Sequence, residues 1–194
     1  MSEEPLGPDP LTRSLLTNER LAEVAAMGIP AFVRRALRME RALEELDARL
    51  RSERSRRLAS LLPQARALAA AGAEGARLPS ATRALLETLR AEPDFARRKA
   101  SPPRRIDRAI DELALRVKRF NEGWINLLER VPIDEVRMLQ RDYNRFYPIE
   151  KQCALRGVRQ APFEPVRLLE REDLLARWPL LELPTREEDL SQKL

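Results

Sequence analysis

The residues best placed to do chemistry in this 194-residue chain are a dense group of cations between positions 97 and 108. Arginine and lysine side chains bind phosphates and carboxylates through charge-assisted hydrogen bonds. Two prolines, Pro102 and Pro103, would hold an irregular loop at the start of a helix, where backbone amides favour anions. The sequence therefore predicts contact with phosphate or with an acidic partner at six residues: Arg97, Arg98, Lys99, Arg104, Arg105 and Arg108.

Three interpretations of this basic cluster stay open. It could bind nucleic acid, although Phe95 is the only aromatic residue near it and stacking platforms normally use several. It could contact the acidic C-terminal arm of the same chain, or it could be a solvated surface. Arginine is abundant throughout the chain together with alanine, which is also typical of coding bias in a GC-rich bacterial genome.

Catalytic chemistry is poorly supported, because the chain has no histidine. Histidine is the commonest general acid or base at neutral pH and the commonest metal ligand. Cys153 is the only cysteine, so neither a Cys/His zinc site nor an internal disulfide can form. Asp107 and Asp111 share a helical face, but acidic residues are expected near a helix N-terminus. We predict no catalytic residue, no metal and no cofactor.

Two spacings resemble functional motifs but lack their context. Tyr147 and Lys151 match the Tyr-x-x-x-Lys spacing of short-chain dehydrogenases, yet none of the six glycines forms the nucleotide-binding turn that this chemistry needs. Residues 21–35 resemble a helix-turn-helix, but Val24 and Arg34 stand where the motif requires a small and an apolar residue. Both matches are interpreted as chance.

The elements that would position the basic cluster are helices. Charged residues make up 35% of the chain and aromatic residues 5%, and the abundance of Ala, Leu, Glu and Arg favours helix over strand. Apolar residues at three-four spacing predict a helix over 104–131. They are Ile106, Ile110, Leu113, Val117, Phe120, Trp124, Leu127 and Val131. Within this helix Gly123 predicts close packing of another helix or of the arm against Trp124.

A second apolar pattern begins at Pro30 and continues to Leu50. Two long amphipathic helices predict an all-α fold, an antiparallel hairpin or bundle with coiled-coil packing. The polar stretch 51–57 is predicted to project beyond the core as solvated helix. Short helices are predicted at 80–90 and 171–177.

The chain is predicted to have three parts: a disordered leader (1–11), a helical bundle domain (12–157) and a proline-broken C-terminal arm with one short helix (158–194). The arm carries apolar residues that need burial, so we expect it to dock on its own bundle or on a partner. These residues are Leu174, Leu175, Trp178, Leu180 and Leu181.

These patterns predict a non-enzymatic helical protein–protein interaction or scaffold protein. A protein partner or homo-oligomer is expected; the alternative is a nucleic-acid-binding protein that uses Arg97–Arg108. The N-terminus lacks a signal peptide and the sequence lacks a membrane span, so we expect a cytoplasmic protein without membrane contact.

Overall fold

The structure, a computed structural model, describes residues 30–157 and 165–186, with side chains described for 33–145 and 165–186. These residues form six helices and no strand. The all-α prediction is therefore confirmed for this part of the chain. The predicted leader lies outside the described residues.

The chain divides into two compact units, each built from separate stretches of sequence. The described part of the first unit comprises residues 30–50, 130–157 and 165–178, and that of the second comprises 51–129 and 179–186. The arm contributes residues to both units, and the boundary at 157 between bundle and arm stays a prediction.

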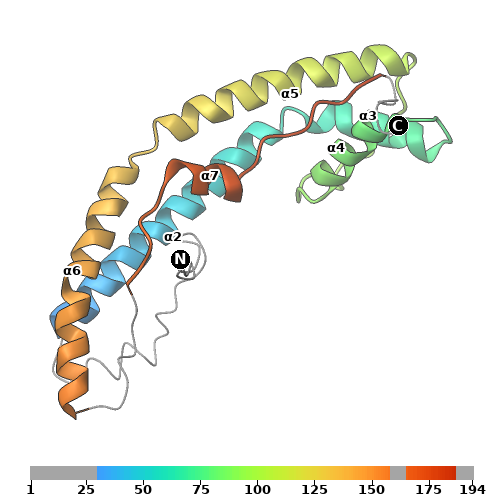
Figure 1. The fold of residues 1–194 in the computed structure, drawn as a ribbon. Coiled ribbons are helices and arrows are strands. Elements are labelled where there is room, and N and C mark those ends of the chain that lie inside the picture. The colour runs from blue at the N-terminus through green and yellow to red at the C-terminus, as the bar shows by residue number, and fades with distance from the viewer. Residues whose placement is uncertain (1–29, 158–164, 187–194) are drawn as a thin grey trace, which may run out of the picture. The chain divides into compact units, whose positions relative to one another are not determined.

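Helix α2 (Pro30–Leu58) belongs to the first unit up to Leu50. There it lies beside α6 (Ile133–Gly157), and the two helices run in opposite directions (Figure 1). α2 begins at Pro30, whose fixed φ suits a first helical turn. The predicted seam is confirmed: Ala36 and Met39 are buried and pack with Tyr143 of α6. An ion pair between Arg35 Nε and Asp142 Oδ2 (3.1 Å) joins the same two helices.

The arm enters the first unit as an extended segment followed by α7 (Arg171–Arg177), which has the predicted bounds. Glu170 is the N-cap, and its backbone N–H donates to Asp173 Oδ2 (2.7 Å) in a capping box. Leu174 on the inner face is fully buried. α7 is thus fixed at its start by polar contacts and by one apolar anchor.

The second unit contains α3 (Leu62–Ala73), α4 (Ser80–Arg90) and α5 (Ile106–Glu129) (Figure 1). Pro63 occupies the first turn of α3, as expected from its missing N–H. The predicted helix over 80–90 is confirmed as α4. α5 ends before Val131 because Val131 precedes a proline, which disfavours helical geometry. Its last buried residue is Leu128 rather than the predicted Leu127.

Residues 179–186 of the arm lie along α5 in an extended conformation (Figure 1). Asn121 of α5 forms hydrogen bonds with the backbone of Leu181. Asp111 lies nearer the start of α5 and forms an ion pair with Arg186. Five residues of extended chain and ten helical residues both cover about 15–17 Å. The arm and α5 therefore run in opposite directions in the second unit.

The prediction that residues 51–57 project into solvent is wrong. Arg54 is only 9% exposed, with its guanidinium carbon 5.5 Å and 5.4 Å from the ring centroids of Phe120 and Trp124. Its Nη2 donates to the carbonyl oxygen of Pro179 (2.7 Å). Burial lowers the pKa of Arg54, which nevertheless stays charged at neutral pH. A flat guanidinium packs well on aromatic faces, a property that a hydropathy pattern does not record.

Another helix, α2, packs at Gly123 and Trp124 as predicted, and the close approach at Gly123 itself is made by a side chain of that helix. A Cβ built at this position would lie 2.8 Å from Nη1 of Arg57. Arg57 is also held by Glu53, since its Nε donates to Glu53 Oε1 (2.8 Å). The close approach at Gly123 therefore involves the far end of a flexible side chain.

We expect Gly123→Ala to stabilise the protein by roughly 0.5–1 kcal/mol in urea unfolding. Alanine is favoured over glycine in a helix interior by about this amount, and the Arg57 head can move aside while it keeps Glu53. A loss of stability greater than about 1 kcal/mol would contradict this expectation and show that Arg57 cannot move.

None of the helices in the described residues combines the length and the apolar character needed to cross a membrane.

Candidate interaction surface

The six cations singled out in the sequence all lie on the surface of the second unit. Arg97, Arg98 and Lys99 lie in the turns that follow α4, Arg104 and Arg105 precede α5, and Arg108 lies in the first turn of α5; all six are exposed. We call residues 95–108 the basic segment. It contains a single carboxylate, Asp107. The six predicted cations are therefore all exposed and lie on one stretch of chain between the end of α4 and the first turn of α5.

Only two of these cations have an ion-pair partner among the described residues. Arg97 Nη1 lies 2.6 Å from Asp94 Oδ1, and Arg108 Nε lies 3.0 Å from Glu112 Oε1. The structure records no ion pair or hydrogen bond within the described ranges for the side chains of the remaining four. These are Arg98, Lys99, Arg104 and Arg105. The basic segment thus carries four positive charges that the described chain does not neutralise.

α3 and the two flanking helices hold the basic segment in place. Arg66 of α3 donates from Nε to the carbonyl oxygen of Phe95 (2.8 Å), and its Nη2 donates to the carbonyl oxygen of Asp94. On either side, Leu89 at the end of α4 and Ile110 in α5 are buried. An irregular segment whose two ends are fixed by packed helices is a common position for binding residues.

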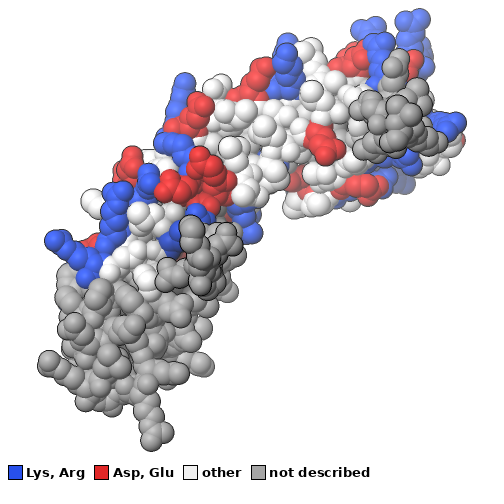
Figure 2. Space-filling view, in the orientation of Figure 1, with Lys and Arg blue, Asp and Glu red and all other residues white. Residues whose placement is uncertain are grey.

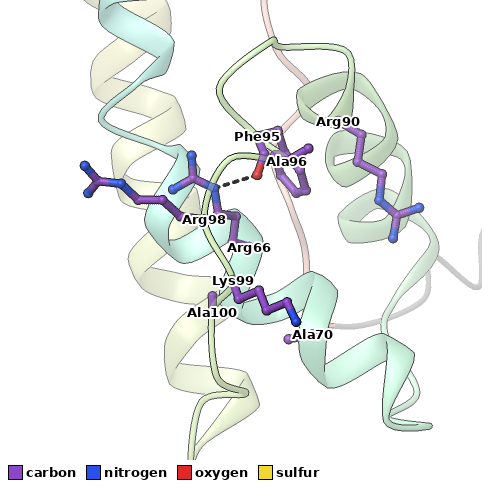
Figure 3. A pocket seen from close by; sticks show the side chains of 8 residues that line it. All are labelled: Arg66, Ala70, Arg90, Phe95, Ala96, Arg98, Lys99 and Ala100. Atoms are coloured by element: carbon purple, nitrogen blue, oxygen red, sulfur yellow. Dashed lines mark hydrogen bonds between the residues drawn. The ribbon is translucent and has the colours of Figure 1, made fainter.

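An open pocket of about 560 Å³ lies beside the basic segment (Figure 3). Residues from α3, α4 and the following turns line it: Arg66, Ala70, Arg90, Phe95, Ala96, Arg98, Lys99 and Ala100. The lining surface is mainly apolar, with cations at its edges and no carboxylate among the lining residues. In Figure 3 Lys99 extends toward Ala70, and the Phe95 ring lies beside Ala96.

The charges elsewhere on the described surface are mixed. Figure 2 shows Lys and Arg interspersed with Asp and Glu over the described part of the face in view. Several such neighbours are paired, as in Arg56–Glu53 (2.7 Å) and Arg90–Glu87 (2.5 Å), and exposed pairs of this kind contribute about 0–1 kcal/mol each. Exposed cations without an ion pair among the described residues also occur elsewhere, for example at Arg77, Arg83 and Arg119. What distinguishes the basic segment is that its six cations share a single carboxylate, Asp107.

The arm residues proposed for partner docking differ in exposure. Leu174 is buried in the first unit and Leu181 in the second, Trp178 is half-buried, and Leu175 and Leu180 are 40% and 41% exposed. Partner contact by the arm stays a prediction. Within the chain, the two buried leucines are anchors that hold the arm on its own helices.

Side-chain amides that the sequence analysis did not single out bind the backbone of the arm. In the first unit, Gln140 Nε2 donates to the carbonyl oxygen of Arg167 (3.1 Å), and its Oε1 accepts from Leu169 N–H (2.8 Å). Asn144 makes the same two-way contact with Val166 (2.7 and 2.8 Å). In the second unit, Asn121 makes it with Leu181 (2.8 and 2.9 Å).

Asp107 and Asp111, the two carboxylates that share a face of α5, do not belong to a cluster of metal ligands in the described structure. Asp111 pairs with Arg186, and the described residues contain no group of three or more potential metal ligands. The side chains of Tyr147, Lys151 and Cys153 lie outside the described residues, as does most of the helix-turn-helix-like stretch 21–35.

No family model, curated protein or solved structure matches this chain. The function proposed below therefore rests on the residues and geometry described above.

Proposed function

We propose that this chain is a non-enzymatic interaction protein whose helices act as a scaffold for the basic segment, and that the basic segment binds an acidic segment of a partner protein. One observation carries the proposal: within the 14 residues 95–108 the basic segment exposes six cations beside a single carboxylate, and four of these cations have no ion pair within the described chain. An excess of positive charge within one stretch of chain favours a bound anion that neutralises it.

The arrangement suits a weak, charge-driven contact. An exposed ion pair contributes about 0.2–1 kcal/mol, so four pairs supply at most a few kcal/mol and depend on salt concentration. The same charges accelerate the encounter with an acidic partner. The helices that fix the ends of the segment reduce the entropy lost on binding.

The non-enzymatic part of the proposal rests on the sequence. Without histidine, the chain would have to build an active site from carboxylates, tyrosine, lysine or arginine. In the described structure, hydrogen bonds from Arg56 and Arg57 lower the pKa of Glu53, the hydrogen bond to Glu53 raises the pKa of Arg56, and burial lowers the pKa of Arg54. Glu53, Arg54 and Arg56 are engaged with one another, with other arginines or with aromatic rings, as structural contacts are.

Nucleic acid is the second candidate partner. Five of the six cations are arginine, whose planar guanidinium matches phosphate geometry. Against this partner, Phe95 is the only aromatic residue in the basic segment, whereas single-strand binding normally uses several stacking rings. A nucleic-acid partner would show a steep linear fall of log affinity with log salt concentration.

A binding titration with a matched control tests the proposal. The probe is a fluorescent synthetic peptide of glutamate and aspartate, and anisotropy measures its affinity. The basic-segment variant combines Arg98→Ala, Lys99→Ala, Arg104→Ala and Arg105→Ala. The control variant removes the same number and kinds of exposed cations elsewhere in the second unit. It combines Arg77→Ala, Arg83→Ala, Lys118→Ala and Arg119→Ala.

We expect the basic-segment variant to bind the peptide about fourfold to several hundredfold more weakly than the control, since four pairs of about 0.2–1 kcal/mol each are lost. Equal affinities of the two variants would show that net charge alone drives binding and would refute the proposal. Binding of a single-stranded oligonucleotide in preference to the peptide, with loss in the same variant, would favour the second candidate.

A further inference from the structure

The open pocket beside the basic segment combines an apolar lining with a cationic edge. Phe95, Ala70, Ala96 and Ala100 provide the apolar surface. Its volume of about 560 Å³ falls within the range of roughly 300–1,000 Å³ that binding pockets have. Two of the cations at the edge, Arg98 and Lys99, are without an ion pair among the described residues. The pocket therefore offers an apolar surface and a positive charge side by side.

The other two cations of the pocket already have partners. Arg66 is bound to the backbone carbonyls of Asp94 and Phe95, and Arg90 pairs with Glu87. The two cations without an ion pair thus belong to consecutive residues, Arg98 and Lys99, whose side chains extend in opposite directions in Figure 3. A compact phosphate group, which is best bound by several converging donors, would find few of them free.

The openness of the pocket also bears on the occupant. Pockets for small molecules bury about 70–90% of the ligand surface, and this one is exposed to solvent on a wide side. A side chain of a bound peptide can be buried in an open pocket, because the rest of the peptide lies across the opening and covers that side chain. Flanking carboxylates on that peptide would meet Lys99, which extends toward Ala70, and Arg98, which extends in the opposite direction (Figure 3).

We infer that the pocket takes one bulky apolar side chain from the acidic segment of the partner protein and thereby sets the specificity of the contact. This inference rests on the proposed function and specifies the partner further: carboxylates on both sides of a leucine or a similarly large apolar residue. The cations of the basic segment attract the acidic partner segment, and the pocket favours segments that carry a large apolar residue.

Two peptides that differ at one position test this inference. Both are synthetic peptides of glutamate and aspartate; one has a central leucine and the other a central glycine. Burial of a leucine side chain corresponds to about a tenfold to hundredfold gain in affinity. We expect the wild-type chain to bind the leucine peptide more tightly by that factor, as measured by anisotropy.

A variant that fills the pocket tests whether the preference for the leucine peptide arises there. Ala96 is exposed and lines the pocket, so Ala96→Trp should occupy it without disturbing the core. We expect this variant to bind both peptides with the affinity of the glycine peptide for wild type. Ala84→Trp, on an exposed position of α4 outside the lining, is the control and should keep the preference for leucine.

The outcomes separate the inference from the proposed function. If wild type binds both peptides equally and the basic-segment variant weakens both, the pocket inference is overturned and the proposed function stands. If neither peptide binds wild type, both are overturned. The comparison of the two peptides on wild type needs no substitution, so a misfolded variant would not leave the inference untested.

Discussion

We expect Trp124→Ala to lower the free energy of unfolding by about 3–5 kcal/mol, the usual range for removal of a fully buried tryptophan. Trp124 is 0% exposed and stacks on Phe120, with ring centroids 6.2 Å apart and an interplanar angle of 11°. Its ring also lies 5.4 Å from the Arg54 guanidinium carbon. The substitution would leave a cavity and take away part of the surface that makes burial of the Arg54 charge acceptable.

Urea unfolding followed by circular dichroism measures this loss. Tryptophan fluorescence is less suitable, because the substitution removes one of the two tryptophans. Leu115→Ala is the matched control on the same helix, because Leu115 is 52% exposed, and it should change stability by less than about 0.5 kcal/mol. A loss below about 1 kcal/mol for Trp124→Ala would show that the Trp124 region is not the packed core of the second unit.

The second large effect is expected in the first unit, where Gln140→Leu should lower the free energy of unfolding by about 2–6 kcal/mol. Gln140 is fully buried and satisfies both the N–H of Leu169 and the carbonyl oxygen of Arg167. Leucine has a similar size but no polar atom, so two backbone groups would lose their partner, at about 1–3 kcal/mol each. The arm should then detach more readily from α6.

Amide hydrogen exchange distinguishes this mechanism from general destabilisation. In Gln140→Leu, the Leu169 amide should exchange faster by a larger factor than amides of the second unit. Met138→Ala is the control on the same helix, since Met138 is exposed. Unchanged protection at Leu169 would contradict the role of Gln140 as a clamp on the arm.

The helices could be predicted because each depends mainly on the residues within its own stretch of sequence. Three-four spacing of apolar residues identified α5 and the seam of α2, and short helices were also predicted at 80–90 and 171–177, where the structure has α4 and α7. The burial of Arg54 and Gln140 could not be predicted in this way. Each is polar in sequence and is buried because a partner from another part of the chain meets it: Pro179 and two aromatic rings for Arg54, the Arg167–Leu169 backbone for Gln140.

The candidate site was partly predictable for the same reason. Six cations within a short, proline-containing stretch are visible in the sequence, and charge clusters of this kind are usually exposed. The pocket was not visible, because Arg66 and Ala70 of α3 are separated from Phe95 by the whole of α4. Only the folded chain shows that an apolar surface lies beside the unpaired charges.

Cross-linking at lysine is the most direct test of the central claim that the basic segment is the contact surface for an acidic partner protein. The chain has four lysines, of which Lys99 lies in the basic segment and Lys118 lies exposed on α5. The tagged full-length chain would be treated in its host with an amine-reactive reagent, purified and digested, and the cross-linked peptides identified.

We predict that Lys99, and not Lys118, is joined to a partner protein next to an acidic segment. These cross-links should disappear in a variant that keeps Lys99 but carries Arg98→Ala, Arg104→Ala and Arg105→Ala. Equal numbers of partner cross-links at Lys99 and Lys118, or full release of the co-purified material by nuclease, would contradict the proposed function.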